Sequence, residues 1–342
     1  KGYTVYNRML LPTVFRSVVE DYHHLKNAVQ IWDVSAERQI ELRGPDAARL
    51  MQMLTPRDLR GMQLGQCFYI PIVDETGGMI NDPVALKLAE DRWWISIADS
   101  DMLLWVKGLA YGYRLDVLVD EPDVSPLAIQ GPKADDLMAR VFGDAVRNIK
   151  FFRFGWFDFQ GSSMAVARSG YSKQGGFEIY VDGTENGMPL WNALMEAGKD
   201  LDVHAGCPNG IERIEAGLLS YGNDMTRANT PHEAGLGRFC STQTAIGCVG
   251  RDALLRVAKE GPTQQVRPIS ITGEIPFCDR AWPIMAGSRK VGQVTSAAAS
   301  PDYGTGVAIG MVKMTHWDEG TQLRVETPDG PLEATVLENF WI

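Results

Sequence analysis

The sequence has few cysteines, and none of them show a spacing that binds zinc. Cys240 and Cys248 have seven residues between them, which matches no common zinc motif. An odd number of scattered cysteines also argues against a disulfide framework. The other three cysteines are Cys67, Cys207 and Cys278. We therefore expect reduced thiols and a cytoplasmic protein.

Long apolar runs and an excess of positive charge are also missing. No segment approaches the roughly 18 apolar residues of a membrane helix. The first residues, KGYTVYNRMLLP, lack the long apolar core of a signal peptide. The 33 Lys and Arg residues are outnumbered by 43 Asp and Glu, which gives a formal net charge of −10. Because phosphate binding needs clustered basic side chains, we expect no nucleic-acid partner and no membrane partner.

Common catalytic motifs are absent as well. The sequence has no phosphate-binding loop, no GxSxG and no HExxH. Its histidines show no metal-ligand spacing, so we expect no metal. They are His23, His24, His204, His232 and His316. Carboxylate and aromatic side chains remain as the candidates for chemistry.

An internal repeat is the most informative feature of the chain, whose 342 residues suggest two or three domains. IELRGPDAARLMQML (40–54) and LAIQGPKADDLMARVF (127–142) each contain a short apolar strand, Gly-Pro, and apolar residues at helical spacing. Pro45 and Pro132 stand where the first turn of a helix tolerates a missing N–H. Because strands follow each copy, the pattern predicts two βαβββ units in an α+β fold with antiparallel sheets.

The rest of the chain shows helical and barrel-like patterns. Helices are expected at 188–198 and 208–221. From about residue 265, short strands broken by Gly and Pro indicate a small C-terminal β-barrel or sandwich. KEGPTQQ (259–265) is the expected linker. Four apolar side chains share one stripe of the second helix: Ile211, Ile214, Leu218 and Tyr221.

Asp82 is the first candidate functional residue. It stands in GGMINDP (77–83), just after an expected hairpin turn and just before Pro83. Its carboxylate either caps backbone amides or lies partly buried and binds a cationic or amide-bearing ligand. The pattern leaves both interpretations open.

Glu178 and Tyr180 form a second candidate site. In GGFEIYV (175–181) the alternation of residues places these two side chains on one face of a strand and the apolar ones on the other. If their face lines a cavity, the acid can accept N–H bonds from a heterocycle and the phenol can stack on it. If their face is an outer one, Glu178 is merely solvated.

Other Tyr and Trp residues recur beside these positions. Most are expected in the core, and a few gathered in one pocket could hold an onium cation by cation–π attraction. They are Tyr3, Tyr6, Trp32, Tyr69, Trp93, Trp94, Tyr171 and Tyr221.

Several segments, in order along the chain, resemble motifs of glycine-cleavage T-proteins. These segments are GGMINDPVALKL (77–88), RSGYSKQGGFEIYV (168–181), RIEAGLLSYGNDM (213–225) and VTSAAASP (294–301). YTVYNRMLLPTVF (3–15) and AGCPNGIERIEAGLLSYGNDM (205–225) further resemble the dimethylsulfoniopropionate demethylase branch of this superfamily. The resemblance covers essentially the whole chain.

The resemblance implies a three-domain cloverleaf around a channel that holds tetrahydrofolate. The implied domains are 1–45 plus 127–262, 46–126, and 263–342. The implied reaction moves a methyl group from dimethylsulfoniopropionate to N5 of tetrahydrofolate, which gives 5-methyltetrahydrofolate and 3-(methylthio)propionate. The resemblance also implies a small-molecule substrate and no obligatory protein partner. The implied oligomeric state is a monomer or a homodimer.

The resemblance also implies roles for individual residues. Asp82 matches the carboxylate beside the reactive pterin nitrogens. The cofactor-binding positions that it implies are Tyr69, Ser96, Glu178, Tyr180, Arg213 and Tyr221. The substrate-binding positions are Tyr6, Asn7 and Tyr171.

The sequence departs from these relatives at positions that bear on the methyl donor. Asn81 replaces the first Asp of the T-protein Asp-Asp pair, which speaks against aminomethyl transfer. Arg8 stands where demethylases are expected to have His, and Tyr171 where they have Trp. Lys173 or Arg8 could hold a substrate carboxylate. A folate demethylase of betaine or an O-methyl compound, and an aminomethyltransferase, remain as alternatives.

Overall fold

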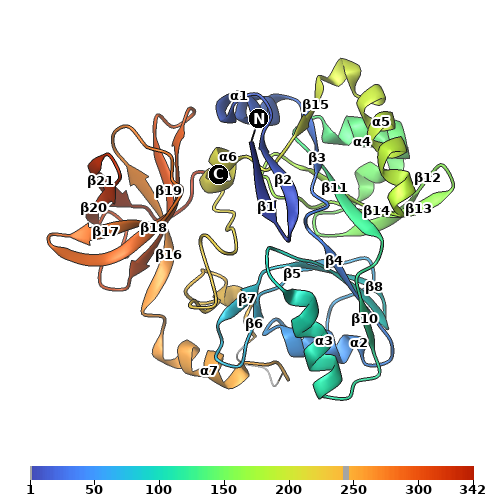
Figure 1. Ribbon diagram of the computed structural model, residues 1–342, viewed down its shortest axis with the longest axis horizontal. Helices are drawn as coiled ribbons and strands as arrows, with labels where there is room; N and C mark the ends of the chain where they lie inside the picture. Colours follow the sequence, from blue (N-terminus) through green and yellow to red (C-terminus); the bar gives the residue numbers. More distant parts are fainter. Residues whose placement is uncertain (1, 242–245) are drawn as a thin grey trace. The chain divides into compact units, whose positions relative to one another are not determined.

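The computed structural model describes residues 2–241 and 246–342, which form two compact units (Figure 1). The first unit comprises Lys1–Leu54, Leu59–Ile70 and Asn81–Asn209. The second comprises Thr55–Asp58, Pro71–Ile80 and Gly210–Ile342. The three-domain division implied by the resemblance stays a prediction.

The first unit contains the repeated motif. The first copy consists of β4 (Gln39–Arg43), α2 (Ala47–Leu54), β5 (Cys67–Tyr69), β8 (Val84–Ala89) and β9 (Arg92–Ser96). The second copy consists of β11 (Val124–Gln130), α4 (Ala134–Phe142), β12 (Phe154–Phe159), β13 (Ser162–Ala167) and β14 (Gly176–Asp182). The strand orders, β5-β8-β9-β4 and β12-β13-β14-β11, correspond, and every pair is antiparallel. The predicted duplication of a βαβββ unit in an α+β fold is confirmed.

Each copy is extended at one edge. The strand β10 (Leu118–Asp120) pairs with β4 and makes a five-stranded sheet. The strands β3 (Val29–Asp33) and β15 (Val203–Gly206) extend the second copy to six strands, with β15 parallel to β3. Because β15 comes long after β3 in sequence, this pairing brings distant residues together.

Both faces of the six-stranded sheet are buried. On one face, α4 and α5 (Gly187–Ala197) bury Leu137, Met138, Leu190 and Leu194 against the sheet (Figure 1). On the other, the two sheets share an apolar cluster that includes Trp94. Burial of one large apolar side chain contributes about 1.5–3 kcal/mol, so these layers hold the strands that carry the candidate residues.

The remaining elements of the first unit are a hairpin, two helices and short turns. Ser17 caps the first helix, since its Oγ accepts a hydrogen bond from the Glu20 backbone N–H at 3.1 Å. The elements are β1 (Gly2–Tyr6), β2 (Met9–Val14), α1 (Val18–Asn27), α3 (Met102–Gly112) and the 3-10 turns η1 (Asp144–Asn148), η2 (Thr184–Asn186) and η3 (Lys199–Leu201).

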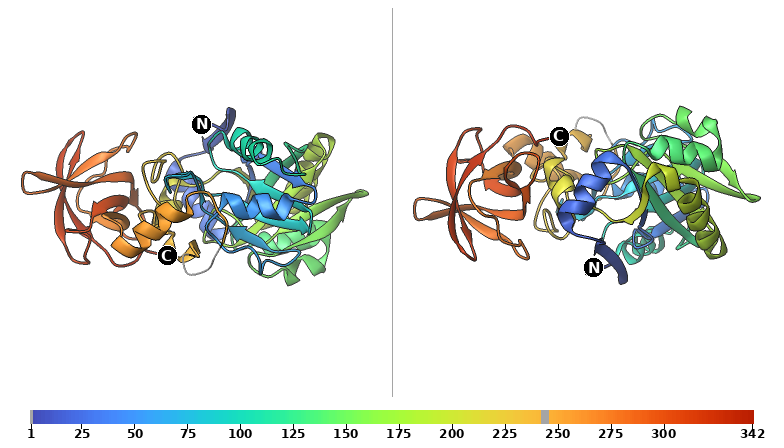
Figure 2. Two further views of the ribbon diagram at one scale, coloured as in Figure 1. Left: turned by 90° about the horizontal axis from the view of Figure 1, so that it is seen from below. Right: turned by 90° about the horizontal axis from the view of Figure 1, so that it is seen from above.

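The second unit ends in a closed barrel, as predicted (Figure 2). Its strand order is β16-β19-β18-β17-β20-β21, and Trp282 and Ile284 are buried inside. The helix α7 (Arg251–Glu260) precedes it and overlaps the expected linker 259–265 only at residues 259–260. The strands are β16 (Gln264–Ile271), β17 (Trp282–Ala286), β18 (Arg289–Ser300), β19 (Thr305–Lys313), β20 (Gln322–Thr327) and β21 (Gly330–Val336). Short elements in this unit are β6 (Ile72–Val73), η4 (Gly237–Phe239) and the helix α6 described below, and β7 (Met79–Asn81) belongs to it except for its last residue.

The helix predicted over 208–221 is shorter than expected. In the structure α6 spans only Gly210–Glu215. Gly217 has a φ of +66°, and a Cβ there would lie 2.4 Å from the Phe340 ring. A left-handed glycine ends a helix. The predicted continuation to Tyr221 is therefore wrong.

Two further sequence predictions can be compared with the structure. All five cysteines are free. Among the described residues, none of the helices has both the length and the apolar character needed to span a membrane.

Candidate active site

The tip of the β1–β2 hairpin is held by Asn7. Asn7 and Arg8 have φ values of 47° and 66°, as a two-residue turn of type I′ requires. The buried Asn7 side chain donates to the carbonyls of Ala36 at 2.9 Å and Ile97 at 3.3 Å, and its backbone N–H donates to Asp99 Oδ1 at 2.8 Å. Asn7 thus fixes the predicted substrate-binding segment against two loops.

Asn81 fixes one of those loops from another side. Its side-chain nitrogen donates to Ala98 O at 2.9 Å and Ser100 Oγ at 2.8 Å, while its Oδ1 accepts from Ala98 N at 3.0 Å. A carboxylate could accept the last bond but could not donate to the carbonyl. The amide is therefore required for this loop, and it fixes the position of the next residue, Asp82.

Asp82 and Tyr69 are in direct contact, as the predicted site needs. The Tyr69 hydroxyl donates to Asp82 Oδ2 at 2.8 Å. The contact follows from the sheet, because Tyr69 on β5 pairs with Val84 on β8, two residues beyond Asp82. Asp82 is partly buried and follows β7. Its carboxylate is oriented by a phenol, which agrees with the ligand-binding interpretation better than with backbone capping.

Glu178 is a buried carboxylate in the middle of the six-stranded sheet. Its side chain is on β14, between Ala128 of β11 and Ala167 of β13, and only 7% of the residue is exposed. Ser169 donates a short hydrogen bond to it. Burial raises the pKa of Glu178, and the Ser169 bond partly offsets this. Glu178 is therefore not a solvated residue on an outer face.

Tyr180 lies on the same face but inside the core. It has no exposed surface, and its ring centroid is 5.9 Å from that of Trp94. Burial, followed by the charge of Glu178, raises the pKa of its phenol. Ser96 lies nearby on β9 and accepts a hydrogen bond from Gln39 Nε2 at 2.9 Å. The roles of Tyr180 and Ser96 in pterin binding stay predictions.

Tyr6 lies within electrostatic reach of carboxyl groups on three separate segments. Burial raises the pKa of Tyr6 well above its usual value, and Glu37, Asp82, Tyr171 and Asp99 raise it further. Burial and the charges of Glu178 and Asp82 likewise raise the pKa of Glu37. Glu37, Asp82 and Glu178 thus form a group that we call the carboxyl cluster.

Glu37 was not singled out from the sequence. It lies in the short connection between β3 and β4, where no periodicity applies. The only available signal was its place within IWDVSAERQIEL (31–42), a segment that resembles the demethylase branch.

The other predicted donor-site residues differ in exposure. Tyr171 is partly buried and packs against an apolar cluster that includes Trp32 and Leu25. Arg8 is exposed and pairs with Asp101 at 2.5 Å. Lys173 is exposed. Of the predicted donor-site residues, Tyr6 is the one that lies within electrostatic reach of Glu37, Asp82 and Tyr171.

Arg213 and Tyr221 belong to the second unit. Arg213 donates to Asp224 Oδ2 at 2.9 Å, Leu218 O at 3.1 Å and Ser296 Oγ at 2.6 Å. The Tyr221 hydroxyl donates to Met79 O at 3.0 Å. Both side chains have structural hydrogen bonds, and their roles toward folate stay predictions.

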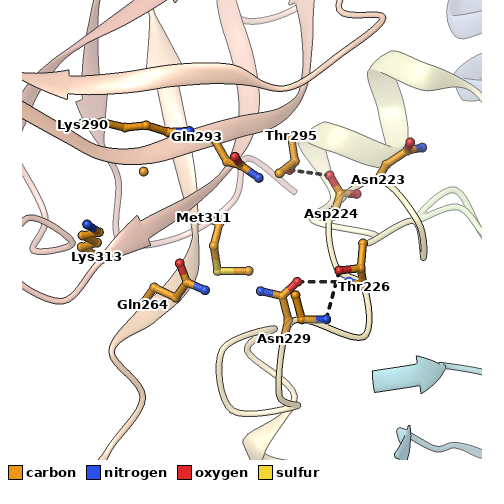
Figure 3. A pocket seen from close by; sticks show the side chains of 12 residues that line it. Asn223, Asp224, Thr226, Asn229, Gln264, Lys290, Gln293, Thr295, Met311 and Lys313 are labelled. Carbon is orange, nitrogen blue, oxygen red and sulfur yellow. Dashed lines mark hydrogen bonds between the residues drawn. The ribbon is translucent and has the colours of Figure 1, made fainter. Parts of the chain in front are cut away.

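A cavity of about 360 Å³ in the second unit does not carry the predicted chemistry. Figure 3 shows amide, hydroxyl and lysine side chains around it, with Thr295 donating to Asp224 at 2.7 Å. The predicted site residues do not line it. The lining residues are Asn223, Asp224, Thr226, Ala228, Asn229, Gln264, Lys290, Gly292, Gln293, Thr295, Met311 and Lys313.

Two histidines meet an aspartate in a cluster that sequence spacing did not reveal. His24, Asp202 and His204 have ligand atoms within 4.8 Å of one another, and the two rings stack at 4.2 Å. Gln30 Oε1 accepts from Trp32 at 2.8 Å, so Gln30 Nε2 must be the group that faces His24 Nδ1 at 3.2 Å.

This arrangement fixes the tautomer of His24. Its Nδ1 accepts from Gln30, and its Nε2 therefore carries the proton and donates to Asp202 O at 2.8 Å. Burial, the neighbouring His24 and the Arg16 guanidinium lower the pKa of His204. Both nitrogens of His24 are engaged and a cation, Arg16, adjoins His204. The hydrogen bonds thus favour a structural role over a metal site.

Family models match nearly the whole chain. The GCVT N-terminal domain matches residues 3–244, and the glycine cleavage T-protein C-terminal barrel domain matches residues 269–341. The chain belongs to the glycine-cleavage T-protein family. The resemblance stated from the sequence motifs is confirmed.

Relatives of this family member differ in their activities. It is 60% identical over 341 residues to the dimethylsulfoniopropionate demethylase of Ruegeria pomeroyi, covering 100% of this chain and 93% of the relative. It is 29% identical over 342 residues to an aminomethyltransferase of Caldanaerobacter subterraneus subsp. tengcongensis, covering 97% and 90%. The solved aminomethyltransferase T of Bartonella henselae, 24% identical, has the same fold, with a TM-score of 0.89 over 100% of this chain and 94% of that one.

Proposed function

We propose that this chain transfers a methyl group from the sulfonium of dimethylsulfoniopropionate to N5 of tetrahydrofolate. The products are 3-(methylthio)propionate and 5-methyltetrahydrofolate. The observation that carries the proposal is the 60% identity, over the full chain, to a dimethylsulfoniopropionate demethylase. Tyr6, which lies within electrostatic reach of Tyr171 and of carboxyl groups, agrees with it, because aromatic faces and carboxylates attract an onium cation.

The buried carboxyl groups of the first unit fit a reduced pterin. A pterin ring presents N–H donors along its edges, and carboxylates accept such bonds. Glu178 is buried beside a single hydroxyl donor, Ser169, and Asp82 is oriented by Tyr69. Glu178 would hold the ring, and Asp82 would lie at the reactive nitrogen. Bound folate supplies the nucleophilic N5.

The reaction needs little acid–base machinery from the protein. As the new N–C bond forms, the C–S bond breaks and its electron pair stays on sulfur, so a neutral thioether leaves without protonation. The proton of N5 is released, and Asp82 is placed to accept it or influence its departure. The protein must align the two reactants and exclude water. Asn7 and Asn81, by fixing the loops around Tyr6 and Asp82, support this alignment.

The surroundings of Asn81 favour demethylation over aminomethyl transfer. Because residue 81 is an asparagine, it offers no second carboxylate beside Asp82. Both hydrogens of its side-chain amide are donated to the 98–100 loop. A demethylase acting on betaine or an O-methyl compound remains the second candidate, because Arg8 and Tyr171 depart from the residues expected in demethylases of this sulfonium.

A panel of donors tests this proposal. The protein is incubated with tetrahydrofolate and, separately, with dimethylsulfoniopropionate, glycine betaine or an O-methylated aromatic compound, with and without exhaustive chelation. We expect 5-methyltetrahydrofolate with dimethylsulfoniopropionate, at the same rate after chelation. If the protein turns over only another donor, the assignment of dimethylsulfoniopropionate as its substrate is wrong. If chelation removes the activity and only a specific metal restores it, the direct-displacement mechanism is wrong.

Tyr171 gives a prediction about the methyl donor. If its ring faces the sulfonium, Tyr171→Ala raises KM for dimethylsulfoniopropionate by about 30-fold, because a desolvated cation loses roughly 2 kcal/mol of cation–π attraction. Tyr171→Trp keeps or lowers KM, since indole is the better partner. Steady-state kinetics on both variants checks this.

The alternative for Tyr171 is a purely structural role, since its ring packs against Trp32 and Leu25. In that case both variants lose thermal stability while KM stays unchanged in the folded fraction. A third result, in which only Tyr171→Trp uses dimethylsulfoniopropionate, indicates a different natural donor and leaves the folate chemistry intact.

We also propose a cytoplasmic enzyme that acts without an obligatory protein partner or metal, as a monomer or homodimer. The five free thiols suit a reducing compartment. A small diffusible methyl donor needs no carrier protein.

A further inference from the structure

The cavity in the second unit has no part in the proposed reaction. Its volume is about 360 Å³, the size of a small-molecule site. One loop, 223–229, and three neighbouring strands of the barrel, β16, β19 and β18, supply its lining (Figure 3). All of these segments belong to one unit, so the cavity can be described without reference to the other.

The strand register places four of the lining side chains on the outer face of the barrel. Gln264 of β16 is opposite Lys313 of β19, and Gln293 of β18 is opposite Met311 of β19. Met311 and Lys313 are two positions apart on β19, so their side chains point to the same face. Val312, between them, is buried inside the barrel. An apolar side chain and a lysine therefore lie side by side, each with an amide beside it.

Two lysines give the cavity an excess of positive charge. Lys290 of β18 and Lys313 of β19 line it, and neither forms an ion pair with any residue that the structure describes. Asp224 is the only acid among the described residues of the lining. Its charge is compensated, because Arg213 donates to its Oδ2 at 2.9 Å and Thr295 donates to its Oδ1 at 2.7 Å. The cavity is therefore basic, although the whole chain has a formal net charge of −10.

Amide side chains add hydrogen-bond donors to the cavity. Asn229 Oδ1 accepts from the Thr226 backbone N–H at 3.1 Å, and the Asn229 backbone N–H donates to Thr226 O at 2.9 Å. These bonds close the loop and occupy the amide oxygen, so the Asn229 Nδ2 remains as a donor toward the cavity (Figure 3). The side chains of Gln264 and Gln293 form no hydrogen bond within the described ranges, and each can turn its nitrogen toward an anion.

We propose that this cavity binds a small aliphatic dicarboxylate. One acid group pairs with Lys290 and the other with Lys313, and the amide nitrogens donate further hydrogen bonds to them. The Met311 side chain contacts the carbon chain between the acid groups, which favours an organic diacid over inorganic phosphate. A metal ion fits poorly, because Arg213 already neutralises Asp224, the acid of the lining. This binding site is separate from the methyl-transfer chemistry and does not depend on it.

Matched pairs of acids test the proposal by isothermal titration calorimetry on the whole chain, without folate or methyl donor. Succinate, glutarate and adipate vary the separation of the two acid groups. Each is compared with the monoacid in which a methyl group replaces one carboxylate: butyrate, pentanoate or hexanoate. Inorganic phosphate is the remaining probe. We expect at least one diacid to bind about tenfold tighter than its monoacid, and added salt to reduce this difference.

Lys290→Met and Lys313→Met should each weaken the best diacid by about tenfold, the scale of one hydrogen bond to a charged group. The matched monoacid should weaken by no more than about twofold, because it can use the remaining lysine. Both lysines are exposed, so the variants should fold as wild type does, which thermal unfolding checks. Lys259→Met removes the same charge from the exposed surface of α7, outside the cavity, and is the control.

Two kinds of result overturn the proposal. Diacids that bind no tighter than their monoacids, or phosphate that binds tighter than every diacid, show that the ligand class is wrong. Diacid affinity that is the same in wild type and in both cavity variants shows that the site is wrong.

The source of the dicarboxylate is tested separately, because the glutamyl end of a folate is itself a dicarboxylate. The titration with the best diacid is repeated in the presence of saturating tetrahydrofolate. Unchanged affinity indicates that the natural ligand is a free diacid, and competition that disappears in Lys290→Met indicates that a folate supplies the acid groups. Both results support a dicarboxylate site, and neither requires methyl transfer to occur.

Discussion

Replacing Asp82 by asparagine lowers kcat by about two orders of magnitude, the scale of losing one positioned acid–base group. The asparagine side chain has the same shape, and its amide oxygen can still accept the hydrogen bond that the Tyr69 hydroxyl now donates to Asp82 Oδ2. It cannot accept or stabilise the proton that leaves N5. Tetrahydrofolate affinity should change much less than turnover, because Glu178 still holds the ring.

Single-turnover kinetics and a separate folate-binding titration check this prediction. Asp91→Asn, in the exposed turn between β8 and β9, is the matched control and should behave as wild type. If Asp82→Asn turns over normally but melts at a lower temperature, then Asp82 is a structural residue and the proposed mechanism loses its proton acceptor.

The second large effect is on stability. Arg213→Ala should lower the free energy of unfolding by about 3–5 kcal/mol, because it leaves the buried carboxylate of Asp224 without its cation. Ser220 N, Thr295 and Ser296 still donate to Asp224, but none of them carries charge. Urea unfolding of the two proteins measures the difference.

Arg324→Ala is the control, since Arg324 pairs with Glu326 on the exposed surface of the barrel. Its loss should cost less than about 1 kcal/mol. A variant Arg213→Ala with normal stability and much weaker folate binding would reverse our interpretation. The arginine would then be primarily a ligand-binding residue, as the family resemblance implies.

The sequence predicted the fold well where the pattern was local. The Gly-Pro repeats at 44–45 and 131–132 were sufficient to predict both βαβββ units, because each copy carries its own strand, turn and helix signals. The length of α6 was not predictable in this way. Gly217 ends the helix against the ring of Phe340, a residue more than a hundred positions away, and periodicity contains no information about such a contact.

The site shows the same division between local and distant information. Asp82 and Tyr69 were predicted separately, and the β5–β8 register brings them together. Glu37 sits in a connection without periodicity, so its carboxyl neighbours become visible only in three dimensions. The same holds for His24 and His204, which meet because β15 pairs with β3.

The most direct test of the central claim follows the methyl group itself. Dimethylsulfoniopropionate with both S-methyl groups fully deuterated is incubated with the protein and tetrahydrofolate, and the products are identified by mass spectrometry. We predict equal amounts of 5-methyltetrahydrofolate carrying an intact trideuteromethyl group and of 3-(methylthio)propionate that retains the other. Label that is absent from the folate, or that arrives with deuterium lost to solvent, contradicts direct displacement from sulfur to N5.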